Sequence, residues 1–461
     1  MQLLFVKIEE IVGKAGIIIG DEVSSRPTNW LGLGNREAKA IIRPKTTQEL
    51  SQVMQLCHAA DQSVVPAGGL SGLVQGTDTV KDDVLISLER MREIEVVDEA
   101  GATMIVQAGT PLQLVQERAE QSAMSFAVDL GARGSASIGG LIATNAGGNS
   151  VIRYGMMREQ VLGLEAVLAD GTIISSMNSM LKNNAGYDLK QLFIGSEGTL
   201  GIVTRAVLRL RPQMISTNTV LVAVNDFENI TKILKMFSSE LGGTLNAFEV
   251  MWQNYYSLIL GGNKQHKAPL PDEYAYYILI EACGGDQQID AARFMQVLET
   301  ALADELILDA VVASSEEQRN ALWAIRDDII TLVMTMLPAA AFDVSLPIGC
   351  MEEYIDDVTS NMQDKWGDKA KLVVFGHLGD SNIHLAIGTG VENELDHGEV
   401  EQVVYQPLAA YNGSVSAEHG IGLEKRDWLS TSRSKTELDL MRSLKTMMDP
   451  KNILNPGKVL G

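Results

Sequence analysis

The sequence predicts a protein of several domains, each built from both helices and strands. With 461 residues, the chain is longer than one hydrophobic core normally serves, so we expect two or three domains. Hydrophobic residues make up 46% of the chain, which is enough for packed cores, and the 42 glycines indicate many loops. Together these observations favour a loop-rich α/β or α+β enzyme over an array of helices.

The charge and the cysteine content argue against several classes of function. A formal net charge of −22 argues against nucleic-acid binding, which requires a basic surface, and gives no support to binding of an anionic membrane. Cys57, Cys283 and Cys350 are isolated, so we expect neither an iron–sulfur cluster nor a disulfide framework. The apolar N-terminus is interrupted by Lys7 and Glu9, and no later segment has 18 uncharged apolar residues. These features predict a soluble, cytoplasmic protein without a transmembrane segment.

The N-terminal part of the chain alternates between predicted helices and strands. Residues 1–13 predict a short amphipathic helix, Ala40–Pro44 predicts a brief strand, and Thr46 is placed to cap the helix that follows. A buried strand at Ser63–Val65 then leads into the glycine-rich segment Pro66–Gly76. Because glycine has no Cβ, such a loop lets backbone N–H groups approach a pyrophosphate, although glycine-rich loops are also common in ordinary turns.

The densest glycine region, residues 129–148, combines Gly, Ala, Ser and Thr with few bulky side chains. This composition would let the main chain wrap closely around a flat ligand, with amides and hydroxyls as hydrogen-bond donors. The alternative is a low-complexity linker. We favour the ligand-binding interpretation because Ile138, Leu141 and Ile142 are spaced to be buried.

A hairpin and a further glycine-rich segment follow. Val161–Leu168 predicts a strand that returns through an Asp-Gly turn as Thr172–Ser175. Beyond it, Gly195, Gly198 and Gly201 recur every three residues. This spacing is not the GxGxxG fingerprint of the Rossmann fold, and that fingerprint occurs nowhere else in the chain. If a dinucleotide binds, we therefore expect a fold other than the Rossmann fold.

A second hairpin carries candidate metal ligands. Leu372–Phe375 and Ile383–Ile387 predict two antiparallel strands joined by a turn at residues 379–382. With this turn, His377 is predicted to lie directly across from His384. Opposed residues of an antiparallel pair have Cβ atoms roughly 5 Å apart, so the two imidazoles could bind one divalent cation.

The segment SAEHG adds a carboxylate, Glu418, and a third imidazole, His419. The alternative that His377 and His384 are hydrogen-bonded structural histidines stays open. Three of the six histidines of the chain occur in these two segments, however, which favours a role as ligands. We predict that His377, His384 and Glu418 bind a metal with open coordination positions, a set that suits Zn²⁺ and also Mn²⁺ or Fe²⁺. His419 would remain available for proton transfer.

Six motifs, in this order and spacing, resemble the FAD-linked oxidases: PAGGLSGLVQG, DLGARGSASIGGLIATNAGG, GYDLKQLFIGSEGTLGIVT, GHLGDSNIHL, SAEHGIGLEKRDWL and DPKNILNPGK. The flavin domain of that family is the one found in vanillyl-alcohol oxidase and p-cresol methylhydroxylase. Similar members include D-2-hydroxyglutarate dehydrogenase, D-lactate dehydrogenase and the flavin subunit of glycolate oxidase. The resemblance covers about residues 35–461 and is much more specific than any single motif.

The resemblance implies an α+β protein with four parts. An N-terminal helical segment, residues 1–35, precedes an FAD-binding domain of the vanillyl-alcohol-oxidase type, which consists of two subdomains, at residues 36–212. An α+β substrate domain follows at residues 213–415, in which residues 316–336 are expected to form one long helix. A C-terminal helical segment, residues 416–461, is expected to return to the flavin and complete the active site.

The resemblance also implies FAD as the cofactor, bound between the two subdomains. Because the cofactor loops contain no histidine, we expect the FAD to be held without a covalent bond. The residues expected to contact it lie in the glycine-rich segments and near the C-terminus: Pro66, Gly68, Gly69, Leu70, Ser71, Gly72, Leu73, Gly131, Ser135, Ser137, Gly139, Gly140, Asn145, Gly147, Gly148, Glu197, Gly198, Ile202 and Asn455.

The reaction implied by the resemblance is oxidation of a D-2-hydroxy acid to the 2-oxo acid, with hydride transfer to flavin N5. A bound metal would lower the pKa of the substrate hydroxyl. His419 would accept the hydroxyl proton as general base, and Arg326 would bind the substrate carboxylate. The alternative for Arg326 is a solvated helix arginine paired with Asp327 or Glu317.

Three positions depart from the pattern of the 2-hydroxyglutarate enzymes. Where those enzymes carry Lys, Asn and often Thr, this chain has Ala341, Ala386 and Ile330. Burial of a second substrate carboxylate without polar partners is costly. We therefore expect a less polar 2-hydroxy acid, lactate-like or larger.

Other functions stay open on the sequence alone. A flavin oxidase that uses O₂ would share the same motifs. A metal-dependent hydrolase would leave the glycine-rich half without a role, and a non-catalytic flavin-binding protein would not require the intact Glu418–His419 pair. Since no iron–sulfur motif is present, the expected electron acceptor is a partner such as an electron-transfer flavoprotein or a quinone, and a homodimer is expected by analogy.

Overall fold

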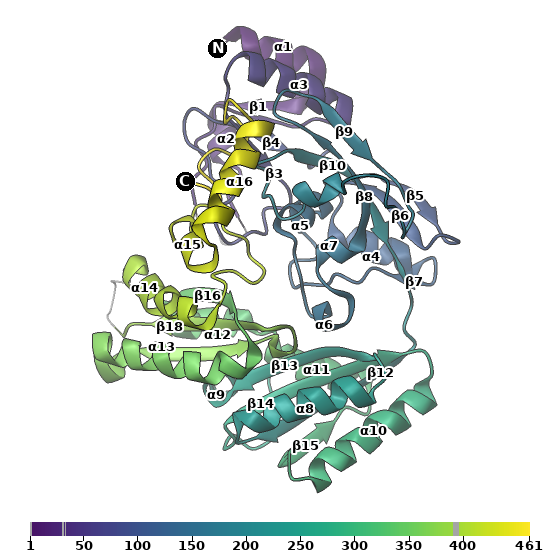
Figure 1. Cartoon of the computed structure of the whole chain (residues 1–461), viewed down its shortest axis with the longest axis vertical. Helices are drawn as coiled ribbons and strands as arrows, with labels where there is room; N and C mark the ends of the chain where they lie inside the picture. Colours follow the sequence, from purple (N-terminus) through teal and green to yellow (C-terminus); the bar gives the residue numbers. More distant parts are fainter. Residues whose placement is uncertain (1, 30–31, 33, 391–395) are drawn as a thin grey trace. The chain divides into compact units, whose positions relative to one another are not determined.

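The computed structural model describes residues 2–29, 32, 34–390 and 396–461 (Figure 1). The chain forms two compact units. Unit 1 contains the residues up to 148, residues 154–213 and residues 418–461, and unit 2 contains residues 149–153 and 214–417. Both units combine helices with strands, so the predicted α+β class is confirmed. Of the predicted N-terminal segment, residues 1, 30, 31 and 33 lie outside the described residues.

The strands of unit 1 form a mixed sheet, an antiparallel sheet and a short strand pair. They are β1 (Ile17–Ile19), β2 (Ala40–Ile42), β3 (Val64–Ala67), β4 (Val84–Ser87), β5 (Ile94–Asp98), β6 (Thr103–Gln107), β7 (Met124–Ser125), β8 (Val161–Val167), β9 (Ile173–Ser176), β10 (Ile202–Arg209) and β11 (Arg211–Pro212). The mixed sheet has the order β1–β2–β4–β3, in which β2, β4 and β3 are parallel. The antiparallel sheet has the order β5–β6–β10–β8–β9, and β11 pairs with β7. The predicted hairpin of β8 and β9 is confirmed.

Several helices of unit 1, among them α1, α3, α4 and α5, contribute apolar side chains to one large buried cluster. Thr46 begins α3 as predicted, because its side chain accepts a hydrogen bond from the Glu49 N–H at 3.1 Å. The helices of this part are α1 (Gln2–Val12), α2 (Asp21–Ser24), α3 (Thr47–Ala59), α4 (Leu112–Glu120), α5 (Ile138–Thr144), α6 (Val151–Tyr154, across the unit boundary), α7 (Met157–Gln160), α15 (Leu429–Ser432) and α16 (Lys435–Met448), with short 3-10 turns at Lys14–Gly16, Leu189–Leu192 and Arg426–Trp428.

The C-terminal segment of the chain is fixed to unit 1 beside β3. The Val64 N–H donates to the Ile453 carbonyl at 2.7 Å, and the Asn455 N–H donates to the Val64 carbonyl at 2.7 Å. Ile453 and Leu454 are buried. This pairing extends the edge of the mixed sheet and brings Asn455 close to the glycine-rich loop that begins where β3 ends.

Unit 2 is organised around an antiparallel sheet with the order β15–β12–β14–β13–β17–β18–β16 among the described strands. The strands are β12 (Ser216–Val224), β13 (Leu245–Trp252), β14 (Tyr276–Gly284), β15 (Asp309–Val312), β16 (Ala340–Ser345), β17 (Lys371–Gly376) and β18 (Asn382–Gly388). The helices are α8 (Phe227–Glu240), α9 (Gln253–Gly262), α10 (Gln287–Ala303), α11 (Glu316–Arg326), α12 (Ile329–Met336), α13 (Met351–Trp366) and α14 (His397–Leu408), with 3-10 turns at Ile348–Cys350, Gly367–Lys369, Leu378–Asp380 and Ala409–Tyr411.

One face of this sheet carries the apolar core that supports the candidate site. Side chains of α9, α11 and α12 pack there on alternate residues of the strands, such as Leu221 and Ala223 of β12 and Val373 and Phe375 of β17. The helices α8 and α10 lie against the same sheet, α8 at β12 and β13 and α10 at β12 and β14, where the intervening residues, such as Val222, are equally buried. Because both faces are covered, the central strands are apolar almost throughout.

The structure corrects two predictions made for this unit. Residues 316–336 do not form one helix, because α11 ends at Arg326 and α12 starts after Asp328, whose carboxylate accepts a hydrogen bond from the Thr331 N–H at 3.0 Å. His377 does not lie directly across from His384. The residue paired with His384 is Phe375, because the 3-10 turn at Leu378–Asp380 takes up the residues between the strands.

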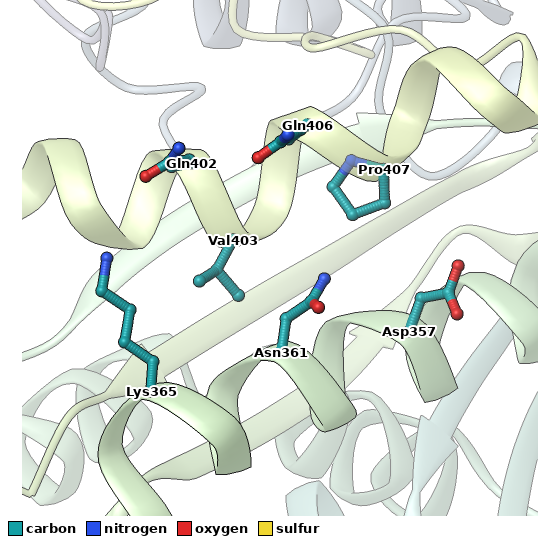
Figure 2. A pocket seen from close by; sticks show the side chains of 7 residues that line it. All are labelled: Asp357, Asn361, Lys365, Gln402, Val403, Gln406 and Pro407. Atoms are coloured by element: carbon teal, nitrogen blue, oxygen red, sulfur yellow. The ribbon is translucent and has the colours of Figure 1, made fainter.

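A surface groove of about 450 Å³ runs between α13 and α14, as Figure 2 shows. The residues that line it are Asp357, Asn361, Lys365, Gln402, Val403, Gln406 and Pro407. The side chains from α13 are spaced four residues apart and so belong to one face of that helix. No residue predicted to bind the cofactor, the metal or the substrate is among those that line this groove.

Candidate active site

Glycines from two segments of unit 1 form the predicted cofactor cradle. Gly68 and Gly69, which follow β3, line a pocket of about 180 Å³ together with Ser135 and Ser137. A Cβ built on Gly69 would lie 1.8 Å from the Ser135 carbonyl oxygen, and a Cβ on Gly68 would lie 2.4 Å from the Ser137 Oγ. Only glycine allows these two loops to approach so closely. The exposed backbone that results fits the phosphates of a dinucleotide.

The second glycine-rich segment ends in helix α5, and residues of that segment cap both ends of the helix. The Ser137 hydroxyl accepts a hydrogen bond from the Gly140 N–H at 3.4 Å, and Asn145 ends the helix in the left-handed region with φ of 52°. Ile138 and Ile142 are buried, which confirms their predicted burial. Gly148 has φ of 125°, and a Cβ there would lie 1.9 Å from the Asp129 carbonyl oxygen. The segment is therefore a folded loop and helix, and the linker alternative is wrong.

Glu197 and Asn455 connect the cofactor cradle to the C-terminal segment within unit 1. The Glu197 carboxylate accepts hydrogen bonds from the N–H groups of Ile421 and Gly422 at 2.7 and 2.9 Å. Burial raises the pKa of this carboxyl, and these two hydrogen bonds act in the opposite direction. Asn455 Nδ2 donates to the Glu197 carbonyl at 2.8 Å, while Asn455 Oδ1 is buried and has no hydrogen-bond partner among the described residues. A buried acceptor of this kind suits a ligand that carries an N–H donor.

The remaining residues predicted to contact the cofactor also lie in unit 1. They lie in β3 and the loop after it, before and in the first turn of α5, on the loop that follows α5, and before and at the start of β10: Pro66, Leu70, Ser71, Gly72, Leu73, Gly131, Gly139, Gly147, Gly198 and Ile202. Segments far apart in the sequence thus converge on one part of this unit.

The two candidate metal histidines lie side by side in unit 2, although they are not register partners. His384 is in β18, and His377 is the first residue after β17, at the cap of the 3-10 turn. Their ring centroids are 5.3 Å apart, with the ring planes at 80°. His377 is buried and His384 is half-buried. The predicted proximity of the two rings is therefore present, but the short turn produces it and not cross-strand pairing.

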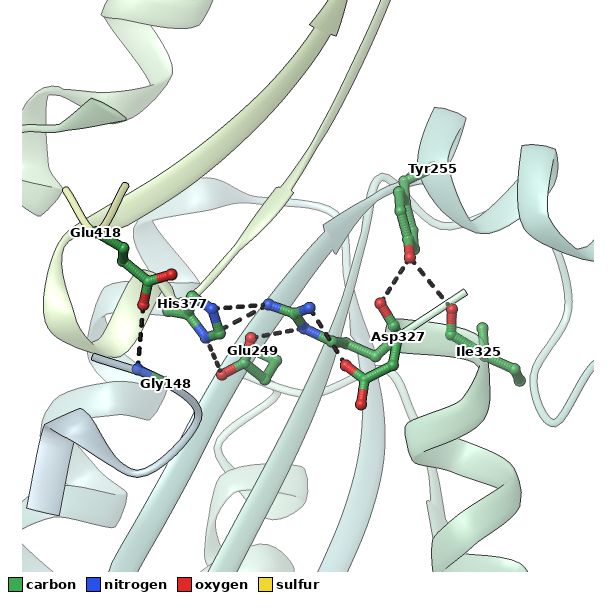
Figure 3. Close-up of polar contacts among 8 residues, drawn as sticks. Gly148, Glu249, Tyr255, Ile325, Asp327, His377 and Glu418 are labelled. Carbon is green, nitrogen blue, oxygen red and sulfur yellow. Dashed lines mark hydrogen bonds and ion pairs between the residues drawn. The ribbon is translucent and has the colours of Figure 1, made fainter. Parts of the chain in front are cut away.

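A buried carboxylate that the sequence analysis did not single out, Glu249 of β13, joins His377 to Arg326 (Figure 3). Glu249 Oε1 accepts from the His377 ring Nδ1 at 2.8 Å, and Glu249 Oε2 accepts from the Arg326 Nε at 2.8 Å. The Nη2 atom of Arg326 lies 3.1 Å from His377 Nε2. Burial alone would raise the pKa of Glu249, but the neighbouring His377 and Arg326 outweigh it and lower that pKa to about 2.

Arg326 occupies the last turn of α11 and is 6% exposed. Its Nη1 lies 3.3 Å from Asp327 Oδ1, so one of the partners considered in the sequence alternative is present. The alternative as a whole is wrong, because the guanidinium is buried and its shorter contact is to Glu249. The Arg326 carbonyl accepts a hydrogen bond from the Tyr255 hydroxyl at 2.6 Å, which fixes the end of the helix.

Glu418 and His419 lie in unit 1, directly after the chain leaves unit 2 at Ala417. The Glu418 carboxylate accepts a hydrogen bond from the Gly148 N–H at 3.2 Å, and both Glu418 and His419 are half-buried. Within unit 2, the Ala417 N–H donates to Asp343 Oδ2 at 3.0 Å, and Asp343 is the register partner of His384. Glu418 therefore follows, in the chain, a residue whose N–H is fixed to Asp343.

Two buried carboxylates, Glu249 and Asp343, were absent from the predicted site. Each interrupts an apolar strand, in the segments AFEVM and AFDVS. An ionised group inside such a strand requires a partner, because burial of an unpaired charge is costly. This conflict between the charge and the pattern of the strand is the sequence signal that could have identified both residues.

Family models of a flavin-binding oxidoreductase match segments of the chain in both units. The FAD binding domain family matches residues 38–176, and the family of FAD linked oxidases, C-terminal domain, matches residues 214–459. The probable mitochondrial D-2-hydroxyglutarate dehydrogenase of Oryza sativa subsp. indica is 37% identical over 454 residues, which span 98% of this chain and 80% of the rice protein. The chain therefore belongs to the family of FAD-linked oxidases, as its motifs predicted.

Other comparisons agree with this assignment. The putative mitochondrial D-lactate dehydrogenase of Schizosaccharomyces pombe is 34% identical over 466 residues, which span 98% of this chain and 88% of the yeast protein. The crystal structure of p-cresol methylhydroxylase with substrate bound aligns with a TM-score of 0.76 and 13% identity, over 100% of this chain and 97% of that one. The second likeness shows that the fold is shared.

In the part of the chain that the structure describes, no helix combines the length and the apolar character that are needed to cross a bilayer. The cytoplasmic location stays a prediction, and the rice and yeast relatives are named as mitochondrial proteins.

Proposed function

We propose that the chain is an FAD-dependent, metal-assisted dehydrogenase that oxidises a D-2-hydroxy acid to the 2-oxo acid. The observation that carries this proposal is the pair His377 and His384, with ring centroids 5.3 Å apart, beside the buried arginine Arg326. A 2-hydroxy acid requires a group that activates its hydroxyl and a cation that pairs with its carboxylate. The names of the relatives, D-2-hydroxyglutarate and D-lactate dehydrogenase, indicate the same substrate class.

The residues of unit 1 fit FAD, and those named for the metal fit a divalent cation. When bound, FAD supplies a two-electron acceptor whose N5 can take the hydride from the substrate Cα. A Zn²⁺ ion, or Mn²⁺ or Fe²⁺, held by His377, His384 and Glu418 would supply the positive charge that lowers the pKa of the substrate hydroxyl. The FAD is proposed to be held without a covalent bond.

The protein residues then divide the remaining tasks. Arg326 pairs with the substrate carboxylate through its guanidinium, which favours a planar, two-oxygen partner. His419 accepts the proton of the substrate hydroxyl as general base, because a neutral imidazole is a base of suitable strength near neutral pH. Of these residues, Glu418 and His419 belong to unit 1, and His377, His384 and Arg326 belong to unit 2.

The proposed substrate has an apolar side chain. Ala341 and Ala386 are register partners on β16 and β18, and Ala386 belongs to the buried apolar cluster that includes Leu332 and Met336. His384 lies two residues from Ala386 on the same strand, so their side chains share one face of the sheet. A second substrate carboxylate would meet apolar groups on this face, and its desolvation would not be compensated.

The electron acceptor is proposed to be a partner such as an electron-transfer flavoprotein or a quinone. This choice follows the absence of an iron–sulfur motif in the sequence and the dehydrogenase names of the relatives. A homodimer is proposed by analogy. An oxidase that uses O₂ would differ in one measurable property, the rate at which O₂ reoxidises the reduced flavin.

The proposal is tested by anaerobic reduction of the purified yellow protein with a panel of D- and L-2-hydroxy acids. We expect bleaching by D-2-hydroxy acids with apolar side chains, loss of bleaching after treatment with a chelator, and recovery on addition of Zn²⁺ or Mn²⁺. If no D-2-hydroxy acid bleaches the flavin, the proposed function is wrong. If chelation leaves the rate unchanged, the metal does not take part.

A variant separates the proposed proton acceptor from the cofactor. His419→Ala should keep the flavin colour but reduce the flavin more slowly by about 10²- to 10⁴-fold, the usual contribution of a general base. The exposed His397 of α14 provides the matched control, and His397→Ala should reduce at the wild-type rate. Reduction of His419→Ala at the wild-type rate would show that another group takes the proton.

A further inference from the structure

Glu249 contacts both a proposed metal ligand and the proposed carboxylate-binding arginine. It is 1% exposed on β13, a strand in the middle of the unit 2 sheet. One of its oxygens lies 2.8 Å from His377 Nδ1, and the other lies 2.8 Å from Arg326 Nε. A single buried carboxylate thus divides its two oxygens between two side chains that come from segments distant in the sequence.

The contact to His377 selects one form of the imidazole. A carboxylate can only accept hydrogen bonds, so Nδ1 must carry the proton, and the lone pair of the ring is then on Nε2. A carboxylate behind a metal-binding histidine orients the ring and makes the ligand nitrogen more basic. Glu249 therefore presents His377 in the form that a metal requires, with Nε2 as the ligand atom.

The contact to Arg326 holds the guanidinium beside the same ring. The Arg326 Nη2 lies 3.1 Å from His377 Nε2 and 3.3 Å from His377 Nδ1. Because Nδ1 carries a proton, only Nε2 can accept from Arg326, and a metal on Nε2 would replace that contact and leave an N–H of Arg326 available to an anionic substrate. Glu249 would keep the arginine in place through Nε during this exchange.

We infer that Glu249 is a positioning residue that holds His377 in its metal-binding form and Arg326 in its substrate-binding position. This inference rests on the proposed function and adds a residue to it. A glutamine at this position could not perform both tasks. If its carbonyl oxygen accepted from His377, its amide group would face the Nε–H of Arg326, and two donors would meet.

The same helix and sheet provide a matched control. Glu281 of the neighbouring strand β14 is also buried, at 2% exposure, and accepts from Arg319 of α11 through Nε at 2.6 Å and Nη2 at 2.9 Å. It also accepts from the indole Nε1 of Trp323 at 2.8 Å. Glu281→Gln therefore removes a buried carboxylate of the same sheet, paired with the same helix, without a contact to His377.

The experiment measures Zn²⁺ affinity by competition with a chromophoric chelator, in the FAD-loaded full chain. We expect Glu249→Gln to bind Zn²⁺ about 10- to 100-fold more weakly than wild type, the usual effect of removing a partner behind a metal ligand. Its KM for the 2-hydroxy acid should rise as well, because Arg326 loses its anchor. Glu281→Gln should bind Zn²⁺ within about 3-fold of wild type, with the melting temperature of both variants recorded as a measure of folding.

The possible results separate this inference from the proposed function. If wild type binds Zn²⁺ and Glu249→Gln binds it equally tightly, the positioning role is wrong and the metal site stands. An equal loss of affinity in Glu281→Gln would also overturn the inference, because the effect would then be a general one. Wild-type protein that binds no metal would overturn the proposed metal site and this role with it. Should Glu249→Gln fail to fold, Glu249→Asp, which keeps the charge but is shorter by one methylene, is measured against the same limits.

Discussion

Two arginines of helix α11 each bind a buried glutamate of the unit 2 sheet, and the two ion pairs differ in what surrounds them. Arg319 pairs with Glu281, whose carboxylate also accepts from Trp323 Nε1 and from the Thr219 hydroxyl at 2.8 Å each. Arg326 pairs with Glu249, whose other oxygen is engaged by His377. The first carboxylate receives donors from structural side chains, whereas the second is shared with an imidazole.

This difference separates a structural ion pair from one that can serve chemistry. The donors around Glu281 are a guanidinium, an indole N–H and a hydroxyl, none of which is an imidazole that could bind a metal. An imidazole that donates through Nδ1 has its acceptor lone pair on Nε2, which here faces Arg326 Nη2 at 3.1 Å and which a metal could bind in place of that N–H. The Glu249 pair thus connects the core of unit 2 to groups that can bind a metal and an anion, while the Glu281 pair joins α11 to the sheet.

The largest expected difference follows removal of the two arginines. Arg326→Ala should lower kcat/KM by about 10²- to 10³-fold, since the substrate carboxylate loses a charged partner. It should also destabilise the fold by about 3–5 kcal/mol, because Glu249 stays buried with an uncompensated charge. Arg319→Ala should lower the stability less, since the Arg319 side chain is 36% exposed and water can reach its site. Steady-state kinetics and urea unfolding measure both effects.

The distinction between the two ion pairs is wrong if Arg319→Ala lowers kcat/KM as much as Arg326→Ala does at a similar melting temperature. In that case both arginines would affect activity only through the placement of α11, and neither pair would be functional in its own right.

A smaller effect is expected from a charge added to the unit 2 sheet, on strand β16. Ala341 is exposed on β16 and is the register partner of Ala386. Ala341→Lys would provide a cation for a second carboxylate, so kcat/KM for a dicarboxylic 2-hydroxy acid should rise about 10-fold relative to a monocarboxylic one. Ala341→Met has a similar reach without the charge and should not change this ratio. An unchanged ratio in the lysine variant would remove Ala341 from the substrate-contacting residues.

The smallest expected effect concerns the junction that follows Arg326. Burial acts to raise the pKa of Asp328, but hydrogen bonds from Asn263, Thr331 and His266 outweigh it and lower that pKa to about 2. A carboxyl whose pKa is lowered on folding stabilises the fold above its unfolded pKa, 3.8, and loses this contribution as the pH falls through about 2. The difference in melting temperature between wild type and Asp328→Asn should therefore be constant above pH 4 and shrink towards pH 2. A difference that does not change with pH would mean that the cap of α12 does not depend on this charge.

Much of the fold and part of the site could be predicted from the sequence because their causes are local. Thr46 caps α3 by accepting a hydrogen bond from Glu49, three residues away. Gly69 lies so close to the Ser135 carbonyl that only glycine fits there. These features depend on short stretches of chain, so the pattern of residues was enough to indicate them.

The network around Glu249 could not be predicted in this way. Glu249 is 128 residues from His377 and 77 from Arg326, so their meeting depends on which strands are neighbours in the sheet. The register that places Phe375 and not His377 opposite His384 depends on the 3-10 turn between the strands, and a shift of one residue would turn each side chain to the other face.

The sequence alone therefore determined that this chain has glycine-rich cofactor loops, a histidine pair and the motifs of the FAD-linked oxidases. Only the tertiary structure decided which buried carboxylate stands behind His377 and Arg326. The physical reason is that a charge in an apolar strand must find a partner, whereas the identity of that partner is set by the pairing of β17 with β13 and by the packing of α11 on the sheet, which no local pattern encodes.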